Sequence, residues 1–141
     1  MKKIFKFKSE IYPSTVFITF ENDINLLKNK YIFCDNSTLS EEDVNSYDAV
    51  YNSLTTSIAL GFPVMERSSR ELGIMIIINE PDLTDQYIIT HESVHVADYI
   101  FQFIGSVPQS FAEGNECYAY LVEWTSKCLT KVLNTYDTRR I

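Results

Sequence analysis

The pattern of hydrophobic and polar residues predicts β-structure in the first part of the chain. Residues 4–8 are close to an alternation of apolar residues and lysine, and residues 15–20 are rich in β-branched and aromatic side chains. Tyr12-Pro13-Ser14 lies between these segments and is typical of a turn, so a β-hairpin is expected. A short helix over residues 22–29 and a short apolar segment at residues 31–33 follow.

The middle of the chain predicts a polar surface segment and then two strands. Residues 35–48 are the most polar stretch, although the apolar residues of the segment 44–54 are spaced three and four apart. A helix that begins near Ser40 and a loop are therefore both compatible with this segment. Residues 57–65 predict a strand, and the continuous β-branched run at residues 74–78 predicts a buried strand.

Two helices are expected after these strands. Apolar residues recur between positions 88 and 104, and Gly105 and Pro108 mark the end of that helix. Ser110-Phe111-Ala112-Glu113 has the pattern of a capping box, so a second helix is expected to begin there and to run to about Leu133. Because the connection between the two helices is short, we expect them to be antiparallel and in contact.

These elements predict an α+β fold in which an N-terminal β-sheet packs against two antiparallel C-terminal helices. The chain has 141 residues, of which 45% are hydrophobic, and this is enough for one domain with a core. Within that single domain, residues 1–70 are expected to form the sheet and a surface segment. Residues 71–134 are expected to form a strand and the two helices, and residues 135–141 a tail.

The charge and the cysteines narrow the class of protein. The net charge is −7, which disfavours binding to nucleic acid and to anionic membranes. Three widely spaced cysteines indicate a reducing compartment rather than a disulfide framework. The longest apolar run is far shorter than the ~20 residues that cross a bilayer, and lysines interrupt any signal-peptide core at the N-terminus. A cytoplasmic location is expected.

The first predicted helix contains the motif with the clearest chemistry. His91-Glu92-Ser93-Val94-His95 is an HExxH sequence, and its two histidines are the only ones in the chain. On a helix His91 and His95 lie one turn apart on one face, so both imidazoles can bind one metal ion. Glu92 lies about 100° around the helix from His91, where it can act as a general base.

A catalytic zinc site requires a third protein ligand, which the second helix can supply. Its carboxylates include Glu113, Glu116 and Glu123. Glu113 already belongs to the capping box, and Glu123 lies two turns beyond Glu116. Glu116 is favoured because it would face the first helix once the pair folds back, but the other two remain alternatives.

Further groups around the metal are suggested by helical spacing. Asp98 and Glu123 are in range to accept a hydrogen bond from the second ring nitrogen of a ligating histidine. Asp98 is equally compatible with the solvent-exposed side of its helix.

The combination of HExxH with Asn115-Glu116 about twenty residues later resembles the gluzincin metallopeptidases. Glu116-Cys117-Tyr118-Ala119-Tyr120 also resembles the Glu-x-x-Ala-Tyr pattern of small phage and bacterial zinc peptidases, which are minimal zincin-like domains. The resemblance covers residues 73–124.

This resemblance implies a zinc metallopeptidase. His91, His95 and Glu116 would be the Zn²⁺ ligands, and Glu92 would activate a zinc-bound water. The strand at residues 74–78 would form the edge that pairs with an extended peptide substrate, through residues such as Ile76 and Ile77. Tyr120 is a further candidate for contact with the substrate.

Larger gluzincins often use a further histidine to stabilise the oxyanion. This chain has no third histidine, but a tyrosine hydroxyl can serve, and Tyr118 and Tyr120 are nearest in sequence. Each of them is also compatible with ordinary packing.

Two alternatives to a peptidase remain. The domain could be a metal-binding, zincin-like module with little or no turnover, acting as a phage or virion accessory that binds a viral or bacterial protein. The same metal chemistry could also hydrolyse a non-peptide amide, such as a cell-wall linkage.

Overall fold

The computed structural model describes residues 1–34 and 44–139 of the chain. Within these ranges the strands are β1 (Ile4–Lys8), β2 (Thr15–Thr19), β3 (Tyr31–Phe33), β4 (Ala59–Glu66) and β5 (Leu72–Ile78). The α-helices are α1 (Ile24–Lys28), α2 (Val44–Leu54), α3 (Gln86–Phe103) and α4 (Glu116–Arg139). Two 3₁₀ helices, η1 (Pro81–Leu83) and η2 (Phe111–Glu113), flank α3 in the chain.

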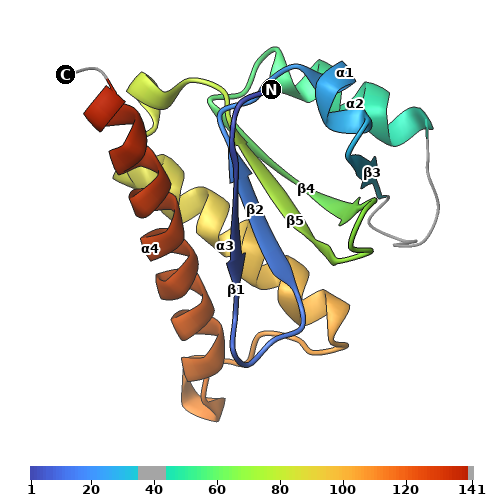
Figure 1. The fold of residues 1–141 in the computed structure, drawn as a ribbon. Helices are drawn as coiled ribbons and strands as arrows, with labels where there is room; N and C mark the ends of the chain where they lie inside the picture. The colour runs from blue at the N-terminus through green and yellow to red at the C-terminus, as the bar shows by residue number, and fades with distance from the viewer. Residues whose placement is uncertain (35–43, 140–141) are drawn as a thin grey trace.

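The strands form one five-stranded mixed sheet in the order β1-β2-β5-β4-β3. The predicted hairpin is present, because β1 and β2 pair antiparallel. β2 and β5 are parallel, and β4 is antiparallel to both of its neighbours. Two C-terminal helices pack together against this sheet, so the predicted α+β class and the position of the helix pair are confirmed (Figure 1).

Helices cover both faces of the sheet, which follows from the apolar character of β2 and β5 on both sides (Figure 1). One face packs against α3 and α4 through residues such as Val16 and Ile76. The opposite face packs against α1 and α2 through residues such as Phe17 and Met75. The short helix predicted over residues 22–29 is α1.

The polar segment after residue 35, for which the sequence allows a helix or a loop, is helical where the structure describes it. α2 begins at Val44, whereas the predicted start near Ser40 lies outside the described residues. Tyr47 and Leu54 of the predicted pattern are buried against the sheet together with Val50, whereas Tyr51, which the spacing also placed on this side, is exposed.

The start of the second long helix differs from the prediction. Ser110 makes no side-chain capping hydrogen bond and precedes only the 3₁₀ turn η2, which ends at Gly114 with a φ of 91°. This positive φ ends the helical conformation after η2, and α4 begins two residues later at Glu116. The capping box therefore does not start α4. Residues 135–139, which were expected in a tail, belong to α4, and residues 140–141 lie outside the described residues.

The predicted edge strand is wrong in its position. β5 lies in the interior of the sheet, because β2 pairs with one side of it and β4 with the other. Ile76 and Ile77 are fully buried, one on each face, and offer no surface to a substrate. Across the described part of the chain, no helix combines the length and apolar character needed to cross a membrane.

Candidate metal centre

The orientation of α3 is set by a cap at its start and by the packing of its apolar side. The Asp85 side chain accepts hydrogen bonds from the backbone amides of Tyr87 and Ile88, which caps the first turn. Ile89, Val96 and Ile100 then pack against the sheet. The HExxH residues occupy the middle of this fixed helix.

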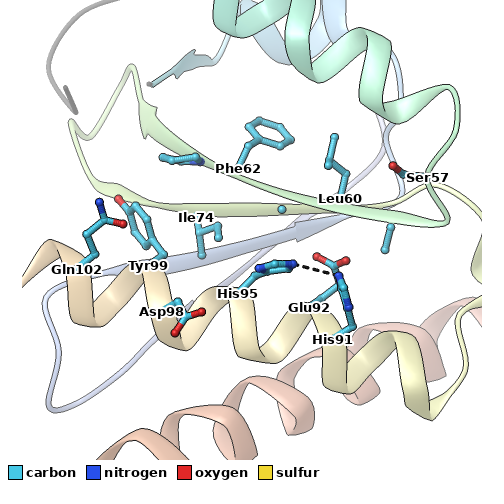
Figure 2. Close-up of a pocket in the computed structure, with 13 residues that line it drawn as sticks. Ser57, Leu60, Phe62, Ile74, His91, Glu92, His95, Asp98, Tyr99 and Gln102 are labelled. Carbon is cyan, nitrogen blue, oxygen red and sulfur yellow. Dashed lines mark hydrogen bonds between the residues drawn. The ribbon is translucent and has the colours of Figure 1, made fainter. Parts of the chain in front are cut away.

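The contact between α3 and α4 determines which way the histidines face. Ser93 and Ser126 hydroxyls lie 3.0 Å apart, and the Tyr118 hydroxyl reaches Asp98, so the two helices are antiparallel as predicted. Because Ser93 lies about 200° around the helix from His91, the imidazoles point away from α4 and towards β4 (Figure 2).

The two imidazoles converge on one point. His91 Nε2 and His95 Nε2 are 3.0 Å apart, and either nitrogen can donate to the other depending on the tautomer. The rings are nearly perpendicular, with an interplanar angle of 79°. Two imidazole nitrogens bound to one tetrahedral zinc ion at ~2.05 Å would be separated by about 3.3 Å. The observed separation is close to this value, so the positions of the two nitrogens are compatible with binding of one zinc ion.

Glu92 lies beside the histidines in a different environment. The residue is only 6% exposed, and its Oε2 atom has no hydrogen-bond partner within the described ranges. Burial raises the pKa of the Glu92 carboxyl to about 7. A buried carboxyl without a partner is costly for the fold, and a pKa near neutrality suits a group that both accepts and returns a proton.

A cleft between α3 and β4 contains these three residues. This α3–β4 cleft has a volume of about 370 Å³. Its lining residues are Ser57, Ala59, Leu60, Gly61, Phe62, Pro63, Ile74, His91, Glu92, His95, Asp98, Tyr99 and Gln102 (Figure 2).

Gly61 faces the Glu92 carboxyl across the cleft. A Cβ atom at this position would lie 3.4 Å from Glu92 Oε2, so the glycine leaves the space beside the carboxyl free. Together, the converging imidazoles and this unfilled space beside an unpartnered carboxyl fit a divalent metal such as zinc with a neighbouring general base.

None of the three candidate third ligands lies beside the histidines. Glu116 begins α4 with an exposed side chain and does not line the α3–β4 cleft. Glu113 is exposed in η2, and Glu123 is exposed and pairs with Lys127. In the ranges 1–34 and 44–139, no group of three His, Cys, Asp or Glu side chains is placed to hold a metal. The assignment of Glu116 as a ligand therefore stays a prediction.

Asp98 lines the cleft but contacts a different residue from the one predicted. Its Oδ1 atom accepts a hydrogen bond of 2.6 Å from the Tyr118 hydroxyl, and none is found to either histidine among the described residues. Burial and the bond to Asp98 raise the pKa of Tyr118 to about 12. Tyr118 thus holds Asp98 in place rather than facing the cleft. Tyr120 is exposed and lines a separate cavity between α4 and the β1–β2 hairpin.

Two cleft residues, Tyr99 and Gln102, were not identified from the sequence. They follow His95 by four and seven residues, so helical spacing alone places them on the same side of α3. In the sequence Tyr99 belongs to the apolar residues that recur between positions 88 and 104, and that pattern predicts packing. Gly61, which also lines the cleft, lies in β4, and its distance along the chain from α3 means that helical spacing could not identify it.

Compared with models of known protein families, with curated proteins and with solved structures, the chain matches none of them. The geometry of the site is therefore the evidence on which a function can be argued.

Proposed function

We propose that this protein is a zinc-dependent hydrolase that cleaves peptide bonds in extended substrates. The observation that carries the proposal is the juxtaposition, in one open cleft, of two converging imidazole nitrogens and a buried, unpartnered carboxyl. This is the arrangement that an HExxH helix requires for metal-assisted hydrolysis.

His91 and His95 would supply two of the protein ligands, and Glu116 remains the candidate for the third. Zinc bound there would polarise the scissile carbonyl and make water nucleophilic near neutral pH. Glu92 would accept the proton that the attacking water loses and then deliver it to the leaving amine. Burial raises the pKa of the Glu92 carboxyl, which makes its carboxylate a stronger base for the first of these transfers.

β4, rather than the predicted β5, is the strand that could pair with a substrate. Its residues 59–62 pair with β5 on one side, and within the described ranges no strand pairs with their other side. This stretch lines the cleft opposite the histidines (Figure 2). A peptide that adds to this edge would lay its backbone along the metal site, which supports extended peptides as the substrate class.

The Glu92→Gln variant tests the proposal. Glutamine retains the size of the side chain but cannot accept the proton, so peptide hydrolysis should fall at least about 100-fold while zinc binding is retained. The measurement is turnover of a broad peptide library by mass spectrometry, with zinc content determined on the same samples.

The matched control is Glu80→Gln, which changes an exposed glutamate outside the cleft and should hydrolyse at the wild-type rate. If wild type and Glu92→Gln bind zinc but process the library identically, the proposed hydrolase function is wrong. A metal-binding module without turnover would then be the better description.

A further inference from the structure

The α3–β4 cleft continues beyond the two histidines. Asp98, Tyr99 and Gln102 line it on α3, with Phe62 and Pro63 of β4 on the other side (Figure 2). The seven residues from His95 to Gln102 correspond to about 10 Å along the helix axis. This length accommodates one long side chain of a bound peptide.

Tyr99 carries an unsatisfied polar group in this part of the cleft. The residue is only 9% exposed, and its hydroxyl has no hydrogen-bond partner in the part of the chain that the structure describes. A buried hydroxyl left without a partner costs about 1–3 kcal/mol. A polar group of a ligand that enters here would supply the missing hydrogen bond.

The remaining groups define the charge that this end of the cleft would accept. Asp98 is held by Tyr118 through Oδ1, and no other hydrogen bond to its carboxylate is found among the described residues. Gln102 offers an amide oxygen. Among the described residues, none that lines the cleft is a lysine or an arginine, so the fixed charge of this lining is negative.

The geometry points to a subsite for a lysine or arginine side chain of the substrate at this end of the cleft. The Asp98 carboxylate would pair with the cation, while the Tyr99 hydroxyl and the Gln102 amide oxygen would accept its hydrogen bonds. This inference rests on the proposed peptidase function.

The direction of β4 sets the position of this basic residue in the substrate. β4 and α3 run in the same direction along the cleft, as Ser57, Leu60 and Phe62 follow the order of the α3 residues in Figure 2. A peptide that pairs antiparallel with β4 therefore has its N-terminal side at Asp98. The basic residue would precede the cleaved bond.

Decapeptides with arginine or citrulline at each position in turn test the subsite, because citrulline has the shape of arginine without its charge. Binding to the zinc-loaded Glu92→Gln protein should be about fivefold to tenfold tighter for the best arginine peptide than for its citrulline partner. Asp98→Asn keeps an oxygen that can accept from Tyr118 and should reduce this ratio to below about twofold. Asp48→Asn removes the same charge from α2, on the opposite face of the sheet, and should leave the ratio unchanged.

Equal binding of the two peptides would overturn the subsite, even if wild-type protein hydrolyses both. Cleavage by wild type that requires arginine only after the cleaved bond would overturn it as well. If no peptide is hydrolysed but the arginine preference depends on Asp98, the proposed function fails and the subsite stands as a peptide-binding site.

Discussion

At the scale of single residues, two buried glutamates show how partners decide the behaviour of a carboxyl group. Glu92 and Glu66 are 6% and 7% exposed. Burial raises the pKa of Glu92, and no hydrogen bond or charge from the described residues outweighs this effect. Burial also acts on Glu66, but hydrogen bonds from Lys6 and Ser69, the charge of Lys6 and the Tyr31 hydroxyl outweigh it and lower the pKa of Glu66. Glu66 is thus held as an anion by its partners, whereas burial favours the neutral form of Glu92.

This difference predicts how stability depends on acid. Because the folded-state pKa of Glu66 lies below its ordinary value of 4.5, its contribution is present above that pH and is lost as the pH falls through the folded-state pKa. Glu66→Gln should lower the free energy of unfolding at pH 7 by about 1–2 kcal/mol and flatten its decline between about pH 5 and pH 3. Urea denaturation followed by circular dichroism measures both effects.

The control for this experiment is Glu80→Gln, which removes one negative charge at an exposed position and should follow the wild-type curve. Identical curves for wild type and Glu66→Gln would show that Glu66 does not stabilise the fold.

At the scale of elements, the sequence predicts what local periodicity determines. His91 and His95 lie on the same helix, so a spacing of four residues is enough to bring their imidazoles together. The place of Glu116 depends on where α4 begins and on the register of α3 against α4. A local capping pattern could not predict either property, because the positive φ of Gly114 separates the Ser110–Glu113 turn η2 from α4.

The neighbours of β5 were beyond prediction for a related reason. A continuous apolar run shows that a strand is buried on both faces, but the run carries no information about which strands pair with its edges. The pairing depends on the long-range contacts of β2 and β4 with β5.

At Gly73 the backbones of β5 and β2 lie too close together for a side chain. A Cβ atom at this position would lie 1.8 Å from the Thr15 carbonyl oxygen, so Gly73→Ala requires the paired strands to move apart. We expect a loss of at least about 3 kcal/mol in the free energy of unfolding, or failure to fold. Gly61→Ala is the matched control, since its Cβ meets neighbours at 3.4–3.8 Å and should cost less than about 1 kcal/mol. Equal stability of the two variants by urea denaturation would contradict the described strand register.

At the scale of the whole molecule, the layered arrangement creates the site. The sheet is covered on one face by α1 and α2 and on the other by α3 and α4 (Figure 1). α3 presents its histidines beside β4, where residues 59–62 have no strand partner on one side within the described ranges. The same arrangement buries the Glu92 side chain beside the cleft. Metal, base and substrate edge would then meet at one place.

The most direct test of this account is the zinc content of purified protein after loading with zinc and removal of the excess. Elemental analysis should find about one zinc ion per wild-type chain, and less than about 0.2 in His91→Ala and in His95→Ala, each of which removes one converging nitrogen. Circular dichroism would verify that the variants are folded. Wild-type protein that is folded yet holds less than about half an equivalent of zinc, or variants that hold as much as wild type, would contradict the metal centre.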